Sequence, residues 1–294
     1  MVTIHDLILL HYPTQKNTTR SRLWYAVKYA VYRIVIASAI RRSRRVIAVS
    51  EFTRRDIVGR YPAASEKIRV TYEAADDRCF LLSAAETAEL FARLGLLRKT
   101  SSLEVSKDLR DIMVPYVLYV GNAYPHKNLG LLLRVAPVFP EVNFVLVGKE
   151  DYFYARLKRT AEARAVGNVI FAGFIADREL GALYRHAALY VFPSLYEGFG
   201  LPPLEAFAYG LPVLSSDRGS LPEILGGAAE YFNPESPDTF RDQCRRLLSD
   251  AMRRAQLRNL GQARLARYHF RKMAEETLSV YRETAVVSRA AKTQ

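Results

Sequence analysis

The chain has 294 residues, half of them apolar, and a formal net charge of +13. This composition excludes an intrinsically disordered protein, and the length is sufficient for two folded domains. No run of eighteen uncharged apolar residues occurs, so we expect no membrane-spanning helix; Cys79 and Cys244 stand in no metal-binding or redox spacing, so we expect a reducing, cytoplasmic location.

The first sixty residues begin with a short strand and are strongly basic. A strand is predicted at Val2–His5, and His5 at its end could donate to a sugar hydroxyl or assist a proton transfer, although a structural role fits equally well. Twelve Lys and Arg residues and only three acidic residues occur up to Arg60. Such an excess suits nucleic acid, an anionic membrane or an anionic substrate. No nucleic-acid-binding motif accompanies it, so we expect no nucleic acid partner.

A long apolar helix is predicted over residues 22–40. Aromatic residues interleave with basic ones along it, at Trp24, Tyr25, Tyr29 and Tyr32. An arginine-rich run follows at 41–45. Two interpretations remain open: the helix lies on an anionic membrane interface, or it is a partly buried domain helix followed by a solvated run of charge.

Strand-like runs alternate with helical patterns along most of the chain. After Val2–His5, strands are predicted at Arg45–Val49, Lys67–Tyr72, Tyr116–Val120, Asn143–Val147, Asn168–Ala172, Leu189–Pro193, Pro212–Ser215 and Ala229–Phe232. Helices are predicted at 22–40, 51–60, 84–95, 128–138, 152–166, 177–186, 202–210 and 220–226, with two or three more from residue 236 onward. This order predicts an α/β fold with parallel sheets covered by helices on both faces.

A polar, charge-rich stretch near 98–114 marks the predicted boundary between two domains. We expect a first Rossmann-like domain and linker at 1–114, a second Rossmann-like domain at 115–266 and a C-terminal helix at 267–294. The first domain offers three strands where a doubly wound domain usually has five or six. We therefore expect this domain to be incomplete, with N-terminal sequence missing from the chain.

The first candidate for a ligand-binding loop follows strand 116–120. Gly121 and Asn122 leave the carboxyl end of that strand, where open α/β sheets bind ligands, and Gly121 lets the backbone approach a ligand closely. Lys127 stands at the predicted start of helix 128–138, where it would place a positive charge near a phosphate. An ordinary helix cap at Asn128 explains the same segment.

The most informative segment is 193–205, which leaves a strand and enters a helix through two prolines. Gly198 and Gly200 let backbone N–H groups approach a ligand, and the helix N-terminus favours an anion. Glu197 and Glu205 stand eight positions apart on either side of this turn, and Glu205 in the first helical turn can accept from a diol. The segment predicts a nucleotide-sugar pocket, although a strand–turn–helix with ordinary acidic caps has the same pattern.

A third loop, Ser215–Glu223, could close one wall of this pocket or simply cap the helix that follows. The sequence contains no Asp-x-Asp, no Cys-x-x-Cys, no Walker lysine loop and no Gly-x-Ser-x-Gly elbow. We therefore expect no metal and no cofactor. Lys127, backbone N–H groups and helix dipoles would meet the charge of a leaving group.

Together these segments resemble the retaining GT-B glycosyltransferases of family 4, also called glycosyltransferase group 1. Glu197–Glu205 resembles the E-x7-E signature of that family, and supporting pieces occur in the family's order within residues 1–283. These pieces are Val2–Asp6, Val49–Thr53, Tyr119–Asn122, Pro125–Asn128, Phe171–Phe174 and Ala274–Tyr281. Asn122 departs from many members, which have an arginine there, and the stretch 71–76 lacks a glycine often found before the aspartate.

The resemblance implies two Rossmann-like domains that face each other across a cleft, with the C-terminal helix crossing back to the first domain. It implies that Glu205 binds the ribose hydroxyls, that Glu197 contacts the donor sugar and that His5 touches the transferred sugar. Lys127 would hold the diphosphate together with neighbouring groups of the donor site, for which the candidates are Gly121, Asn122, Gly198, Phe199, Gly200 and Leu201.

The implied activity is transfer of a hexosyl group, with mannosyl as one candidate, from a nucleotide-diphosphate sugar to a polysaccharide or lipid-linked acceptor with retention of configuration. In a same-face attack the acceptor hydroxyl would lose its proton to the departing phosphate oxygen. Two alternatives stay open: an inactive, N-terminally truncated remnant that binds nucleotide or a partner, and a GT-B nucleotide-sugar epimerase. The expected partners are the donor, the glycan or lipid-linked acceptor, and an anionic membrane contacted peripherally at the inner face of the plasma membrane.

Overall fold

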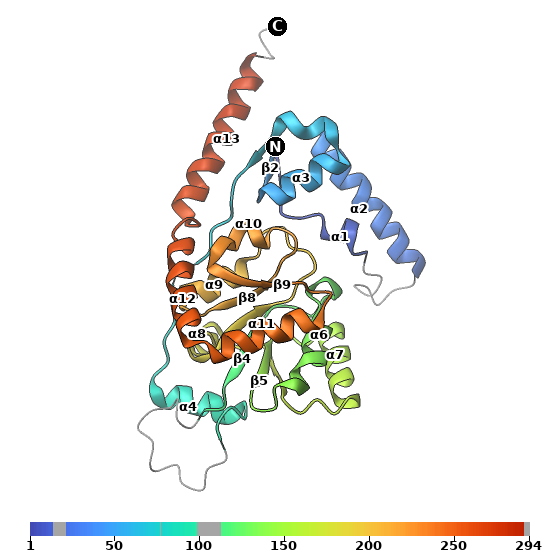
Figure 1. Ribbon diagram of the computed structural model, residues 1–294. Helices are drawn as coiled ribbons and strands as arrows, with labels where there is room; N and C mark the ends of the chain where they lie inside the picture. Colours follow the sequence, from blue (N-terminus) through green and yellow to red (C-terminus); the bar gives the residue numbers. More distant parts are fainter. Residues whose placement is uncertain (14–21, 77, 99–112, 291–294) are drawn as a thin grey trace.

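The computed structural model describes residues 1–13, 22–76, 78–98 and 113–290. Its strands form two parallel sheets (Figure 1). The first holds β1 (Val2–Ile4), β2 (Val46–Ala48) and β3 (Ile68–Val70), and the second holds β4 (Tyr116–Val120), β5 (Asn143–Val147), β6 (Val169–Gly173), β7 (Leu189–Phe192), β8 (Val213–Ser216) and β9 (Ala229–Phe232). The predicted α/β class is confirmed, and each of the nine predicted strands is present.

Helices connect the strands and cover the sheets. They are α1 (Ile8–His11), α2 (Arg22–Arg42), α3 (Glu51–Arg60), α4 (Ala84–Arg93), α6 (Gly130–Val135), α7 (Tyr152–Ala163), α8 (Asp177–His186), α9 (Leu201–Ala208), α10 (Leu221–Leu225), α11 (Pro237–Ser249), α12 (Ala251–Leu265) and α13 (Phe270–Ala290). The sequence did not predict α1 or the 3-10 turn η2 (Pro62–Lys67), because neither is long enough to display a helical period. Among the helices that the structure describes, none combines the length and apolarity needed to cross a membrane.

The first sheet has the strand order β1-β2-β3 and is parallel throughout. Its central strand is buried at every position, which explains the continuous apolar run in the sequence. Ile40 of α2 and Ile57 of α3 pack with strand residues such as Val46 in one hydrophobic core. This small sheet therefore positions α3 and the loops that face the second sheet.

The second sheet has the order β6-β5-β4-β7-β8-β9, and every strand pair is parallel. In chain order this is a doubly wound 3-2-1-4-5-6 sheet, whose topological switch point lies between β4 and β7. Such sheets bind ligands beyond the carboxyl ends of the two strands at the switch point. The loops at Gly121 and at Pro193–Glu205 leave those two ends.

The chain links the two sheets at several points. α4 packs on the larger core, where Phe91 contacts Tyr116 edge to face. α13 rises past the second sheet to the first (Figure 1), where the carboxylate of Glu283 accepts hydrogen bonds from Arg45 and Arg69 at 2.8 and 2.6 Å. The predicted boundary near 98–114 falls mostly outside the described residues, so the domain limits stay a prediction.

Candidate active site

The loop after β4 begins at a glycine that no other residue could replace without strain. Gly121 has φ +149°, and a Cβ atom there would lie 2.8 Å from the hydroxyl oxygen of Tyr119. Its N–H donates to the carbonyl of Val147, and its carbonyl accepts from the hydroxyl of Tyr154 at 2.8 Å. The backbone at the end of β4 is therefore fixed, with Asn122 directly beside it.

Lys127 is positioned by a short 3-10 turn, η3 (Pro125–Lys127). Asn128 follows in the left-handed conformation (φ 56°), and its side-chain amide donates to the carbonyl of Pro234. The predicted helix start at 128 is wrong, because Asn128 ends this turn and α6 begins at Gly130. Asparagine suits both a helix N-cap and the left-handed conformation, which is why the sequence left its role open.

The structure brings Lys127 and Glu197 together from the loops after β4 and β7. Lys127 Nζ lies 2.6 Å from Glu197 Oε1, and the two side chains are 13% and 9% exposed. The ammonium group also lies 5.2 Å from the centroid of the Phe192 ring. A cation and a carboxylate are thus paired in a nearly dry position at the switch point of the sheet.

The third predicted loop packs directly on the backbone of Glu197. The N–H of Ser220 donates to the carbonyl of Glu197, and a Cβ atom on Gly219 would lie 2.8 Å from the nitrogen of Glu197. Gly219 has φ +65°, which glycine adopts at little cost. This loop forms one wall around the Glu197 turn.

Glu205 lies on α9 in a separate cavity of about 230 Å³, lined also by Asp76, Asp177 and Tyr209. Its carboxylate accepts a hydrogen bond from Tyr184 at 3.1 Å. Burial raises the pKa of Glu205, while the hydrogen bond from Tyr184 acts in the opposite direction. The cavity is of a size and polarity that suit a small hydroxyl-bearing group.

Buried tyrosines interact with both carboxylates, Glu197 and Glu205. Burial raises the pKa of Tyr190, and the charges of both Glu205 and Glu197 contribute to that shift, so both carboxylates act on the same ring. The rings of Tyr184 and Tyr190 lie 5.8 Å apart. The sequence did not single out these tyrosines, because a buried aromatic residue in a strand or helix has the pattern of ordinary core.

The glycine-rich turn after Glu197 lies against the first domain. The carbonyl of Gly198 accepts hydrogen bonds from the hydroxyls of Ser50 and Thr53 at 2.6 and 3.1 Å. A Cβ atom on Gly198 would lie 2.0 Å from the carbonyl oxygen of His5, so only glycine fits there. The turn is therefore shared by the two halves of the molecule.

The remaining residues of the turn lead into α9. Phe199 is buried and contacts Tyr268 edge to face. Gly200 has φ +98° and forms the N-terminal cap of the helix, and Leu201 is its first residue. Because Phe199 is packed in the core, its side chain is not available to a ligand.

His5 lies beside the turn through its backbone, but its side chain has another partner. Nδ1 of His5 lies 2.6 Å from Oε1 of Glu73, and the histidine side chain is 68% exposed. The predicted contact of His5 with a transferred sugar stays a prediction.

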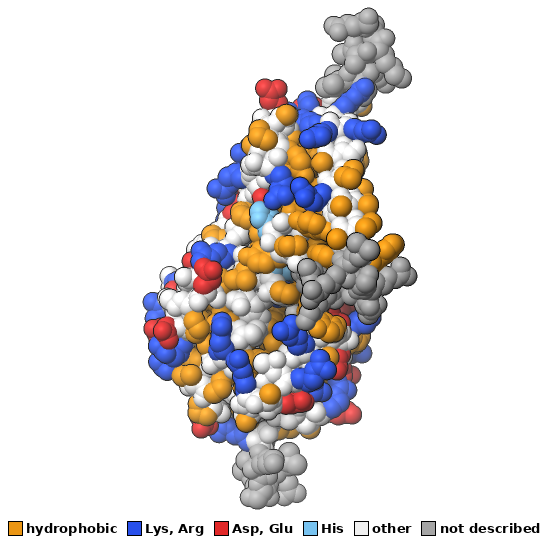
Figure 2. Space-filling model, turned by 90° about the vertical axis from the view of Figure 1, so that its right-hand side faces the viewer, with side chains coloured by type: hydrophobic (Ala, Val, Ile, Leu, Met, Phe, Trp, Pro, Cys, Tyr) orange, Lys and Arg blue, Asp and Glu red, His pale blue; other side chains and the backbone are white. Residues whose placement is uncertain are grey.

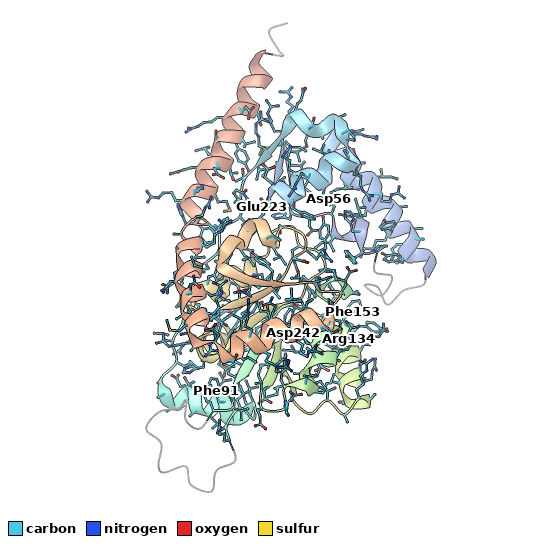
Figure 3. The ribbon with its side chains drawn as sticks, in the orientation of Figure 1. Asp56, Phe91, Arg134, Phe153, Glu223 and Asp242 are labelled. Carbon is cyan, nitrogen blue, oxygen red and sulfur yellow. The ribbon has the colours of Figure 1, made fainter. Side chains whose placement is uncertain are left out.

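Two contacts between the domains were not predicted. The carboxylate of Glu223 on α10 accepts from the backbone N–H groups of Glu51 and Phe52, at 2.7 and 2.8 Å, and so caps α3 of the first domain. The hydroxyl of Tyr196 donates to Asp56, which also contacts His11. Figure 3 places Glu223 and Asp56 where the two halves of the molecule meet.

Two parallel α/β units, a paired lysine and carboxylate at the switch point and a returning C-terminal helix define a GT-B glycosyltransferase. The chain belongs to the family of glycosyl transferases group 1, whose model matches residues 105–264. The model of glycosyltransferase family 4 matches residues 1–78.

Several curated relatives are named as mannosyltransferases. The chain is 26% identical over 257 residues to the O-antigen chain mannosyltransferase RfbU of Salmonella typhimurium, covering 86% of this chain and 62% of that protein. It is 34% identical over 212 residues to the serotype-specific mannosyltransferase WbdA of Escherichia coli, covering 69% of this chain and 26% of that protein. The chain thus spans less than two thirds of the length of either relative.

Solved structures share the fold. Sucrose-phosphate synthase from Thermosynechococcus elongatus superposes with a TM-score of 0.72 at 22% identity, over 97% of this chain and 68% of that one. HepE from Anabaena, in complex with UDP and glucose, superposes with a TM-score of 0.68 at 19% identity, over 97% and 71%. At these identities the likeness establishes the GT-B architecture.

Proposed function

We propose that this chain is a retaining glycosyltransferase that moves a hexosyl group from a nucleoside-diphosphate sugar to a polysaccharide or lipid-linked acceptor. The observation that carries the proposal is the Lys127–Glu197 pair at the carboxyl ends of β4 and β7. The mannosyltransferase names of RfbU and WbdA support mannosyl as the hexosyl group. The donor belongs to the second domain, residues 115–266, and the acceptor to the first, residues 1–114.

The proposed reaction exchanges one bond at the anomeric carbon for another. The bond from that carbon to the diphosphate oxygen breaks, the acceptor oxygen forms its bond on the same face, and the acceptor proton passes to the departing oxygen. The ammonium group of Lys127 offsets the charge that develops on the diphosphate, with backbone N–H groups of the 198–201 turn beside it. Glu197 contacts the sugar and Glu205 the ribose hydroxyls.

Neither Cys79 nor Cys244 forms a disulfide within the described residues. The proposal places the reaction in the cytoplasm. Within the described residues, no group of three or more His, Cys, Asp and Glu side chains is arranged to hold a metal ion. The proposed mechanism assigns its electrostatic part to Lys127 and backbone N–H groups.

A binding experiment tests the donor site before the acceptor is known. The melting temperature is measured with GDP-mannose, UDP-glucose and ADP-glucose, for the native chain, for Lys127→Met and for the control Lys158→Met, whose side chain is exposed on α7. We expect one donor to raise the melting temperature of the native and control proteins but not of Lys127→Met. No response to any donor, or an equal response in Lys127→Met, would contradict the proposal.

Product analysis separates the alternatives. A glycosyltransferase releases the nucleoside diphosphate with transfer to an added glycan or lipid-linked acceptor. An epimerase converts the nucleotide sugar to an isomer without an acceptor. Binding without either product would identify a nucleotide-binding remnant.

A further inference from the structure

The helix α2 is apolar on two opposite faces. Its inner face packs on the first sheet and is formed by residues at helical spacing, namely Tyr25, Tyr29, Tyr32, Ile36 and Ile40. Ile40 is 1% exposed, so this face is core. An ordinary surface helix would carry polar residues on its other face.

The outer face of α2 is apolar as well. It consists of Trp24, Val27, Val31, Ile34 and Val35, which are between 48% and 69% exposed. Their spacing of three, four, three and one residues places them along one side of the helix, opposite the inner face. Helices that cover the same face of a sheet pack against each other's flanks. A further helix beside α2 would therefore leave its outer face uncovered. In Figure 2, which views the side of the molecule where α2 lies, hydrophobic side chains gather on the upper part next to Lys and Arg.

A basic groove of about 710 Å³ runs beside this apolar face. Four arginines line it together with Ile34 of the outer face, namely Arg33, Arg41, Arg42 and Arg60. Among the described residues none of these four arginines has a carboxylate partner within ion-pair distance. The sequence of α2 itself contains no Asp or Glu.

We propose that the outer face of α2 docks on the surface of a bilayer that carries anionic headgroups. Valine, isoleucine and tryptophan side chains would enter the interface between headgroups and acyl chains, and the four arginines would bind the headgroup phosphates. The proposal concerns a surface away from the Lys127–Glu197 pair and stands or falls independently of the transfer reaction.

The positive charge decides between a membrane and a second copy of the chain. A symmetric pair formed through this face would bring two sets of arginines together, and like charges oppose such contact. An anionic bilayer offers both an apolar layer and the opposite charge. An anionic membrane is therefore a single partner that suits both the apolar outer face and the basic groove.

The protein carries its own probe for this test, because Trp24 is its single tryptophan and lies on the outer face. Emission is recorded with vesicles of phosphatidylglycerol and phosphatidylcholine in equal amounts and with vesicles of phosphatidylcholine alone. We expect a blue shift with the anionic vesicles only, reversed by high salt, and quenching when brominated lipids are used. No shift with anionic vesicles, or an equal shift with both kinds, would overturn the proposal.

Two variants separate the apolar and the charged contributions. One variant makes the outer face polar, with Val31→Ser/Ile34→Ser/Val35→Ser. The other removes the charge of the groove, with Arg33→Gln/Arg41→Gln/Arg42→Gln/Arg60→Gln. Each is expected to weaken partitioning into anionic vesicles about tenfold or more. The matched control changes four exposed arginines on other elements, Arg156→Gln/Arg159→Gln/Arg258→Gln/Arg267→Gln, and has the same net charge as the groove variant.

The outcomes are distinct. The control is expected to partition like the native protein, with far-UV circular dichroism confirming that every variant is folded. If the control loses binding as strongly as the groove variant, the effect is one of net charge and the proposal is wrong. A lipid-independent blue shift that grows with protein concentration would assign the face to a second copy instead.

Discussion

The ammonium group of Lys127 lies 2.6 Å from the carboxylate of Glu197, in a position where both side chains are almost fully buried. Water does not solvate either group well there, so each is the main electrostatic partner of the other. A ligand diphosphate that reached Lys127 would compete with Glu197 for the ammonium group, and the displaced carboxylate would then need new partners such as sugar hydroxyls. The pair is therefore assembled before any ligand arrives.

Removing one member of this pair should destabilise the protein more than removing both. Lys127→Met leaves the Glu197 carboxylate buried without a partner, and we expect a loss of about 3 kcal/mol in the free energy of unfolding. The double variant Lys127→Met/Glu197→Gln should recover most of that loss, because no charge remains. Urea unfolding at neutral pH measures both.

The rate of sugar transfer tests the Lys127–Glu197 pair in a second way. If the proposed function holds, Lys127→Met and the double variant should both transfer sugar about 100-fold more slowly or worse. A double variant that regains stability but not transfer would separate the two roles. Native transfer rates in the double variant would remove the pair from the mechanism.

Gly198→Ala should disturb the contact between the domains. A methyl group at this position would lie 2.0 Å from the carbonyl oxygen of His5, so one of the two backbones must shift. We expect a loss of about 3 kcal/mol, at the upper end for overpacking. The matched control is Gly59→Ala in α3, where nothing lies within 4 Å and alanine should add about 1 kcal/mol. If urea unfolding shows that Gly198→Ala and Gly59→Ala are equally stable, the Gly198 loop can shift away from His5 without cost.

His126 should make the protein sensitive to acid. Burial, and then the charge of Lys127, lower the pKa of this histidine from 6.5 to about 3. Between these two values the unfolded chain binds a proton that the folded chain does not, so stability falls as the pH falls through that window. Between about pH 7 and pH 5, the native protein should lose about 2 kcal/mol more than His126→Asn. His269→Asn, which replaces an exposed histidine, is the control and should follow the native pH dependence.

Glu223 should stabilise the arrangement of the two domains. Its carboxylate accepts from the N–H groups of Glu51 and Phe52, where the helix dipole of α3 also favours a negative charge. Burial and the nearby Glu223 raise the pKa of Tyr72 to about 12. We expect Glu223→Ala to cost about 2 kcal/mol and Glu223→Gln about half as much. Small-angle scattering would reveal whether the domains separate in Glu223→Ala, and an unchanged profile together with native stability would refute the bridging role.

The strands of the second sheet could be predicted closely because of their burial. Parallel strands covered on both faces appear as continuous apolar runs, and Tyr116–Val120, Asn143–Val147 and Ala229–Phe232 were predicted with the bounds that the structure has. The Glu197 turn was also apparent, because glycines and prolines have few structural roles in that order. The roles assigned to the site residues remain predictions.

The contacts between the domains could not be predicted from local pattern. Tyr196 and Asp56 are separated by 140 residues, and the carboxylate of Glu223 reads as an ordinary first-turn residue of its own short helix. The pairing of Lys127 with Glu197 depends on the switch point, which follows from the strand order and not from either loop. The sequence also could not show which apolar face of α2 is buried. Because apolar residues occur on both sides of the helix, the pattern does not indicate which side packs on the sheet.

Ser50 and Thr53 hold the carbonyl of the residue that directly follows Glu197. Whatever draws the halves of the molecule apart must break these bonds and free the turn in the same event. If the donor binds at this turn as proposed, its affinity and the spacing of the halves are coupled, and linkage makes the influence mutual. Under the proposed function, a compound that holds the halves apart would weaken nucleotide affinity without contacting the nucleotide itself.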